Sequence, residues 1–162
     1  ATLQTVVGDA LAVALLEARG FTAQDFRVFH PGGRLGASLN FVRDIMHGQE
    51  RLPLAPLGTP MTEAIVLMTQ KGFGCLGIVD GVGALVGIVT DGDLRRHLGE
   101  DLLARTVDEV MSRTPRTVAP DVVVGAALQS MNAAKISALF VVEGARPVGI
   151  VHMHDLLRAG VA

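Results

Sequence analysis

The sequence predicts an α/β (α+β) fold made of two copies of one βαββα unit, packed about a pseudo-twofold axis. The main observation is a duplicated turn, because residues 87–93 (GIVTDGD) recur in altered form as residues 149–155 (GIVHMHD). In both copies an apolar run ends at the turn and a segment containing Leu and Arg follows, which indicates a strand that feeds a helix. With 49% hydrophobic residues in a length of 162, the chain can also bury a sizeable core.

The composition excludes several classes of protein. The formal net charge is −2 and both Trp and Tyr are absent, so the chain lacks the basic surface and the stacking platforms of a nucleic-acid-binding protein. A single cysteine excludes an internal disulfide framework and favours a reducing, cytoplasmic location. No apolar run is long enough for a transmembrane helix, so no membrane partner is expected. The chain begins mid-pattern and without Met, so we expect it to be part of a larger protein.

Residues 1–40 are predicted to hold a buried helix and a glycine-rich loop. Residues 10–18 are apolar on nearly all sides, as in a helix that is buried on most of its faces. The loop comprises residues 30–36 (HPGGRLG), and His30 at its edge is of the residue type that exchanges protons near neutral pH. The alternative is a surface loop whose histidine has no chemical role.

Residues 42–98 and 107–160 are the two copies. Each is expected to run in the order strand, amphipathic helix, strand, turn, strand, helix. Thr59 and Pro60 are expected to cap and begin the first helix, and Asp121 is expected to cap its counterpart. A unit this small buries the faces of its sheet poorly, so packing of the copies should complete the core. That packing is expected to bring the two turns into one central cleft.

The duplicated turn allows two interpretations. Free N–H groups where a strand feeds a helix suit an anion, which predicts a pair of phosphate-facing turns. The alternative is a capping box, in which the Thr90 oxygen accepts from the backbone and the Asp93 carboxylate bonds back. An Asp93–Arg96 pair three residues apart on the helix surface is also expected.

The duplicated unit resembles a pair of cystathionine-β-synthase (CBS) domains over residues 42–160, in the order, spacing and repetition of its segments. The resemblance implies a cleft that often binds nucleotides, in which the motif Asp accepts from ribose hydroxyls and the motif Thr or Ser faces phosphate. It assigns these nucleotide-binding roles to Thr90, Asp93 and Asp155. His152 stands where Thr or Ser is usual; it is not expected to form a compact hydroxyl-type cap, although it can donate to phosphate. The alternative is that one or both clefts are purely structural.

Residues 1–40 resemble the end of a sugar-isomerase (SIS) domain, and nearly the whole chain resembles the D-arabinose-5-phosphate isomerases. The residues that carry this resemblance are 8–21, 29–36, 44–47, 90–96 and 152–161. It implies a parent enzyme that interconverts ribulose 5-phosphate and arabinose 5-phosphate, a sugar phosphate used to make Kdo for bacterial lipopolysaccharide or capsule. His30 matches the histidine implicated in that family and is the expected catalytic residue, as base or ring opener. The other site residues are expected upstream, so this chain alone should be inactive.

The resemblances also imply partners and ligands. No cofactor is required, and the expected ligand is a regulatory nucleotide, either AMP- or ATP-like or CMP-Kdo. CBS pairs commonly pair again, which implies a homo-oligomer: a dimer of CBS pairs and a tetramer in the parent. The alternative function is an oligomerisation module without a ligand. No metal site is expected at the histidines, because they lack cysteine partners. Cys75 and the matched methionines are expected in the core: Met46, Met68, Met111 and Met131.

Overall fold

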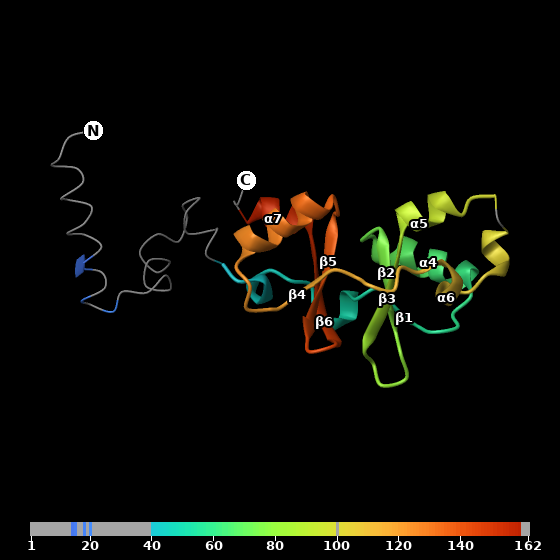
Figure 1. The fold of residues 1–162 in the computed structure, drawn as a ribbon, viewed down its shortest axis with the longest axis horizontal. Helices are drawn as coiled ribbons and strands as arrows, with labels where there is room; N and C mark the ends of the chain where they lie inside the picture. Colours follow the sequence, from blue (N-terminus) through green and yellow to red (C-terminus); the bar gives the residue numbers. More distant parts are fainter. Residues whose placement is uncertain (1–13, 16–17, 19, 21–39, 100, 160–162) are drawn as a thin grey trace.

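The structure, a computed structural model, describes residues 14–15, 18, 20, 40–99 and 101–159. Most of residues 1–40, including His30, lies outside the described residues, and so does the expected end of a sugar-isomerase domain. Both βαββα units are present and lie side by side (Figure 1). The first comprises β1 (Leu54–Pro56), α4 (Met61–Lys71), β2 (Cys75–Val79), β3 (Leu85–Thr90) and α5 (Asp91–Arg96). The second comprises β4 (Thr117–Val118), α7 (Val124–Ala134), β5 (Ala138–Glu143), β6 (Arg146–His152) and α8 (Met153–Arg158).

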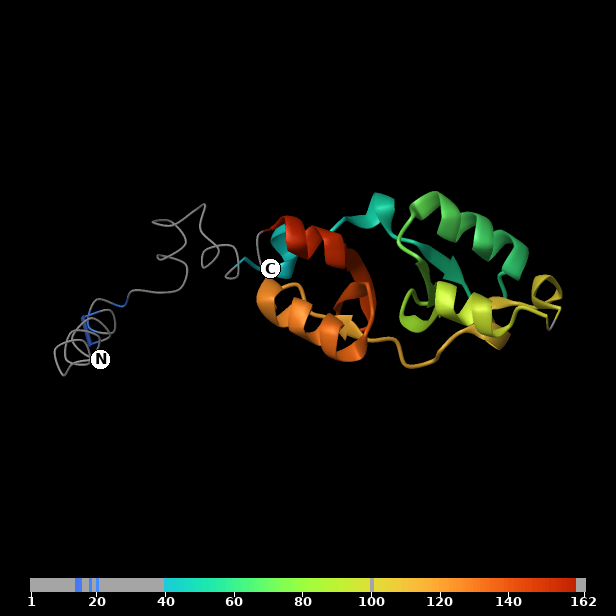
Figure 2. The same ribbon diagram turned by 90° about the horizontal axis from the view of Figure 1, so that it is seen from above.

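Each unit forms a mixed three-stranded sheet with the same topology. In the first, β1 is parallel to β2 and β2 is antiparallel to β3; in the second, β4, β5 and β6 repeat this order. Seen from above in Figure 2, α4 and α5 lie over the first sheet and α7 and α8 over the second. Short helices join these elements: η1 (Val42–Asp44), η2 (Gln49–Arg51), η3 (Leu102–Ala104) and α6 (Val107–Val110). None of the helices in the described ranges is long and apolar enough to cross a bilayer.

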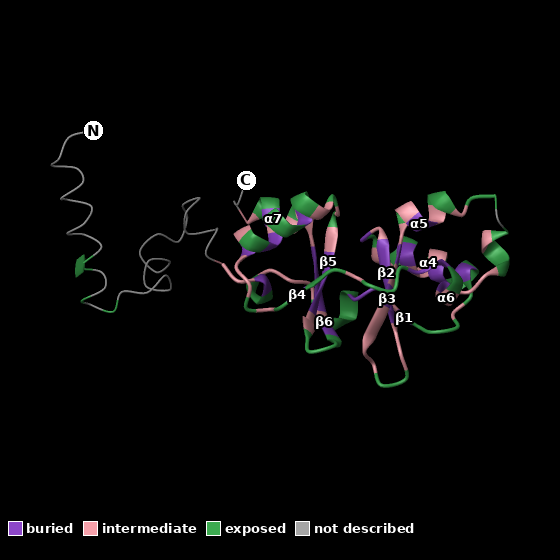
Figure 3. Ribbon diagram, in the orientation of Figure 1, coloured by how far each residue is buried: buried purple, intermediate pink, exposed green. Residues whose placement is uncertain are grey.

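The two copies exchange their leading segments, residues 41–47 and 106–112. Val107 and Met111 of the second leading segment belong to the buried core of the first unit, whereas Val42 of the first belongs to the core of the second unit. Buried positions therefore gather between each sheet, its helices and the leading segment of the other copy (Figure 3). Because each core is incomplete without the other copy, the two units are expected to fold together.

The exchange also changes how two helices begin. The predicted caps Thr59 and Asp121 are wrong, because α4 and α7 follow N-cap residues Pro60 and Val123, which make no side-chain cap bond. The first N–H of α4 instead donates to the Arg105 carbonyl at 2.9 Å, and that of α7 donates to the Asn40 carbonyl at 2.7 Å. Backbone groups beside the leading segments thus satisfy donors that a sequence argument assigns to a side chain.

A third cluster of buried side chains joins the two sheets. Its members come from both units: Leu52, Phe73, Cys75, Phe140 and Ile150. The expected core positions are confirmed for Cys75 and for three of the methionines, which are buried: Met68, Met111 and Met131. Met46 is partly buried and packs against the second core.

Candidate functional site

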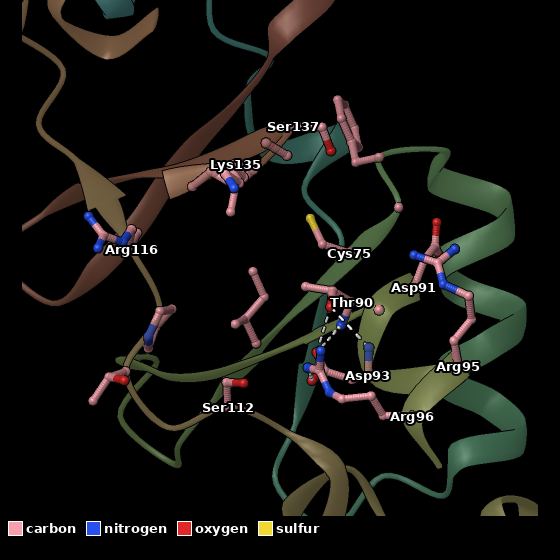
Figure 4. A pocket seen from close by; sticks show the side chains of 18 residues that line it. Cys75, Thr90, Asp91, Asp93, Arg95, Arg96, Ser112, Arg116, Lys135 and Ser137 are labelled. Carbon is pink, nitrogen blue, oxygen red and sulfur yellow. Dashed lines mark hydrogen bonds and ion pairs between the residues drawn. The ribbon is translucent and has the colours of Figure 1, made fainter. Parts of the chain in front are cut away.

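A cavity of about 510 Å³ lies between the first turn and the second unit. Its walls come from both units. The first unit contributes residues 73–75, Ile88, and the turn with α5 within residues 90–96; the second contributes Ser112, residues 114–116, and residues 135–138 at the end of α7 and the start of β5. The side chains of the first turn and those of the second unit face this space from opposite sides (Figure 4). The exchange of leading segments therefore builds the cavity, because it carries residues 112–116 across to the first sheet.

Thr90 and Asp93 form the predicted capping box at one wall of this cavity. The Thr90 backbone N–H and hydroxyl donate to Asp93 Oδ2 at 2.8 and 2.6 Å, and the Asp93 N–H donates to Thr90 Oγ1 at 3.3 Å. The guanidinium of Arg96 donates to Asp93 Oδ1, which confirms the expected pair. Asp93 is only 3% exposed, so these donors compensate a buried negative charge. The cap and the cavity wall are the same structure, and the two sequence interpretations are compatible.

Four positively charged side chains line the cavity together with two carboxylates, Asp91 and Asp93. The cations are Arg95, Arg96, Arg116 and Lys135. Arg95 and Arg96 lie on the α5 side and Arg116 and Lys135 on the opposite side in Figure 4. Because α5 is a single short helix of six residues, attraction for an anion comes from these side chains rather than from the helix end.

Sequence reasoning missed the second wall. Ser112, Arg116, Lys135 and Ser137 line the cavity but belong to no motif of the duplicated turn. The only signal available was the duplication itself, since two packed copies must place some part of one copy against the turn of the other. The particular residues depend on the exchange of leading segments, which the sequence pattern did not indicate.

Lys135 has a backbone conformation that disfavours its own side chain. It ends α7 with a φ of 54°, in the left-handed region, and its counterpart at the end of α4 is Gly72 with a φ of 73°. A residue with a Cβ pays about 1 kcal/mol there relative to glycine. Strain of this kind concentrates at functional sites, and here the strained residue faces the cavity.

Cys75 also lines the cavity, but its thiol is expected to be unreactive. The side chain is buried at 4% exposure. Burial and, to a lesser extent, the negative charge of Asp91 together raise the pKa of its thiol to about 12. The thiol therefore stays protonated near neutral pH and serves as a small apolar wall residue.

The second turn is organised around Asp155 and does not line this cavity. Asp155 Oδ2 accepts from the His152 backbone N–H at 2.9 Å and lies 3.0 Å from His47 Nε2. His152 and Asp155 are absent from the cavity walls, so the expectation that both turns line one cleft is wrong for this cavity. The reason is again the exchange, because each turn faces the leading segment of the other copy.

His152 caps α8 with its imidazole. Its Nδ1 accepts from the His154 N–H at 3.3 Å, so the expectation that histidine cannot replace a hydroxyl cap is wrong. Acceptance requires a neutral ring. Burial lowers the pKa of His152, the nearby His154 and His47 lower it further, and Asp155 opposes them.

Within the described part of the chain, no group of three or more His, Cys, Asp and Glu side chains could hold a metal ion.

Two sheets with exchanged leading segments and a cavity between them define a CBS domain pair. The CBS domain family matches residues 42–100 and 107–162, and the chain belongs to this family. Among curated proteins it is 52% identical to arabinose 5-phosphate isomerase KdsD of Pseudomonas aeruginosa, over 99% of this chain and 50% of that protein. The corresponding enzyme of Escherichia coli K12 is 43% identical over the same shares. The chain thus spans about half the length of these relatives and is homologous to their C-terminal CBS-pair half.

Solved structures agree with this assignment. The CBS domain pair of protein MJ0100, in complex with 5′-methylthioadenosine and S-adenosyl-L-methionine, is 30% identical with a TM-score of 0.67, covering 74% of this chain and 94% of that one. CBSX2 in complex with AMP has a TM-score of 0.65 at 24% identity, covering 75% of this chain and 96% of that one. The second likeness shows the fold alone.

Proposed function

We propose that this chain is the regulatory CBS pair of an arabinose 5-phosphate isomerase, and that the cavity at its first turn binds a nucleotide or a nucleotide sugar. One observation carries the proposal: Thr90 and Asp93 share a cavity of about 510 Å³ with four cationic side chains. The cavity has the size of a small-molecule site and carries more positive than negative side chains, which suits a phosphate-bearing ligand. The adenosine-containing ligands of the related MJ0100 pair support a nucleoside as part of that ligand.

The geometry supports a division of roles within the site. Arg116 and Lys135 face the turn from the second unit and would meet the phosphates. Asp93 would accept from the ribose hydroxyls. Its carboxylate already holds Arg96, so binding would require Arg96 to share or release that oxygen and turn toward the ligand. Arg96 has the freedom to move, since its side chain is 66% exposed.

The relatives support a proposal for the activity of the parent protein. We propose that the whole protein interconverts ribulose 5-phosphate and arabinose 5-phosphate in the cytoplasm, with His30 as an acid or base, and that the CBS pair adjusts its rate. A product of the pathway such as CMP-Kdo would combine a nucleotide, which fits the cavity chemistry, with a carboxylate that the arginines can bind. Regulation would require the ligand to favour one of two states of the enzyme.

Calorimetric titration of the chain with AMP, ATP, CMP and CMP-Kdo tests the binding proposal. We expect micromolar binding of at least one of them, weakened at least tenfold, or about 1.4 kcal/mol, in Arg116→Ala. Arg113→Ala is the matched control, because Arg113 lies three residues earlier, bonds to the Asp108 carbonyl and does not line the cavity. Absence of binding by all four ligands, or equal loss in both variants, would overturn the proposal. Isomerase rates of the full-length enzyme with the same ligands test regulation.

A second candidate function, assembly of CBS pairs into a homo-oligomer, is favoured by a separate groove. It has a volume of about 500 Å³ and lies along β1 and α4. Val66 in the groove is 55% exposed and neighbouring Leu57 is 42% exposed, so association of two pairs here would cover apolar surface. Sedimentation analysis of wild type and Val66→Glu tests this: a dimer that becomes monomeric supports assembly through the groove, and a monomeric wild type opposes it.

A further inference from the structure

The two turns occupy equivalent positions in the two units, but the residues that face them differ. Ser112 faces the first turn and His47 faces the second. Ser112 exchanges two backbone hydrogen bonds with Ile88, at 2.8 and 2.9 Å, and His47 exchanges two with Ile150, at 2.9 and 3.1 Å. Ile88 and Ile150 are equivalent residues of the two strands that enter the turns. Ser112 and His47 therefore occupy equivalent positions in the two leading segments, each beside one turn.

The two side chains have opposite effects on the space in front of the turns. Ser112 is small and lines the open cavity. The His47 ring extends to Asp155, with Nε2 3.0 Å from Oδ2, and its centroid lies 5.3 Å from that of the Phe73 ring. Asp155 is the counterpart of Asp93. In the described part of the chain, the Asp93 carboxylate bonds to Thr90 and Arg96 and to no histidine ring. His47 therefore holds the acidic group that an equivalent ligand would need.

The residues after His47 reinforce this arrangement. They form η2 (Gln49–Arg51), which contacts β6, and the Arg51 guanidinium lies 5.4 Å from the centre of the Phe73 ring. In the first cavity the equivalent stretch, residues 114–116, lines open space. One face of Phe73 is thus covered by side chains of the chain itself.

The charged side chains at the two turns also favour an anionic ligand at the first turn over the second. Four cations line the first cavity: Arg95, Arg96, Arg116 and Lys135. The counterparts of these residues at the second turn are Leu157, Arg158, Arg51 and Gly72, so only two of the four positions keep a positive charge. The counterpart of Asp91 is Met153, so one carboxylate is lost as well, and the charged side chains sum to +2 at the first turn and to +1 at the second. An anionic ligand would therefore be attracted less strongly to the second turn even without His47.

We propose that His47 closes the second of two equivalent nucleotide positions, so that this CBS pair binds one anionic nucleotide per chain, at the first turn. His47 is then a determinant of stoichiometry that acts by occupying Asp155. The occupancy of the first turn rests on the proposed function, whereas the closure of the second turn rests on the contacts of His47 with Asp155 and Phe73 and does not depend on that function. The reciprocal pair Ser112 and His47 makes the proposal testable in both directions.

The experiment is calorimetric titration with each of AMP, ATP, CMP and CMP-Kdo, up to millimolar concentration, of wild type, His47→Ser, Ser112→His and the double variant Asp93→Ala/His47→Ser. We expect one site in wild type, an additional and weaker site in His47→Ser, and loss of the wild-type site in Ser112→His. The double variant should retain only the added site. Thermal melting checks that each variant folds, and His47→Asn replaces His47→Ser if the latter does not.

The outcomes separate the two proposals. Two sites in wild type, or no added site in a folded His47 variant, overturns the closure by His47. No site in wild type with one site in the double variant upholds the closure and overturns the proposed function of the first cavity. No binding in any folded variant overturns both.

Discussion

Phe140 packs its ring against the backbone of Gly77, the residue at the equivalent position of the other unit. A Cβ at Gly77 would lie 2.8 Å from Phe140 Cζ, closer than real contacts of this kind. Gly77 pairs with Leu54 and Ile88, and Phe140 holds the same register with Thr117 and Ile150. A large side chain in one unit therefore fills the space left by the missing side chain in the other. The sheets meet by complementing each other rather than by repeating the same contact.

This contact predicts a coupled effect on stability. Gly77→Ala should lower the free energy of unfolding by about 1–3 kcal/mol, because the methyl group also approaches Leu54 and Leu85 within 2.9 Å. Phe140→Leu shortens the opposing side chain, so the cost of Gly77→Ala should be smaller in that background. Urea denaturation of the four chains of the double-mutant cycle measures the coupling. Strictly additive effects would show that the ring does not limit the space at Gly77.

The exchanged leading segments predict a second close-packing effect. A Cβ at Gly87 would lie 2.3 Å from Met111 Sδ and 3.3 Å from the Ser112 carbonyl oxygen. Gly87→Ala should therefore destabilise the chain by about 1–3 kcal/mol, as overpacking of a core does. Gly81→Ala is the matched control, because nothing lies within 4 Å of a Cβ there. Equal urea midpoints for the two variants would contradict the packing of Met111 against β3.

The left-handed backbone conformation of Lys135 predicts that replacing this residue affects stability and ligand binding in opposite directions. Lys135→Gly should leave the unfolding free energy unchanged or raise it by up to about 1 kcal/mol, because glycine adopts the left-handed conformation without strain. The same change removes a cation from the cavity and should weaken AMP binding. The reciprocal Gly72→Lys should cost stability without improving AMP binding at the first turn. A clearly destabilised Lys135→Gly, or one that binds AMP as tightly as wild type, would refute this prediction.

His152 predicts a pH dependence of stability. Its pKa is lowered in the folded chain, so the unfolded chain binds more protons and the unfolding free energy falls as pH drops below about 6.5. His152→Thr keeps a capping oxygen that does not titrate. Denaturation between pH 5.5 and 7.5 should therefore show wild type losing stability relative to His152→Thr toward low pH. The groups that face His152, namely His154, Asp155 and His47, remain in both chains, so the difference between the two profiles reports the titration of His152 together with its coupling to them. Parallel pH profiles would exclude a neutral imidazole cap.

The secondary structure was largely predictable because its signals are local. The strand–turn–helix pattern indicated both units, and the spacing of Thr90, Asp93 and Arg96 correctly indicated the capping box and the ion pair. Such bonds span three residues, so nearby sequence determines them. The starts of α4 and α7 were placed wrongly because backbone carbonyls remote in sequence satisfy their first N–H groups.

Only the wall of the candidate site that the first turn forms was predictable from the sequence. The residues of the first turn carry a motif, whereas Arg116 and Lys135 on the opposite wall carry none. Nothing in the sequence pattern indicated that His47, more than one hundred residues before Asp155, would occupy that carboxylate. Contacts of this length depend on how the copies pack, not on the residues beside them.

The amino-acid sequence alone determined the duplication, the order of strands and helices, and the capped first turn, because periodicity and short-range hydrogen bonding encode each of them. Only the tertiary structure decided that the copies exchange their leading segments, that Phe140 meets Gly77, and that one turn opens onto a cationic cavity while the other is held by His47. The physical reason is that each unit is too small to complete its own core. Its remaining partners must come from the other copy, at positions set by packing.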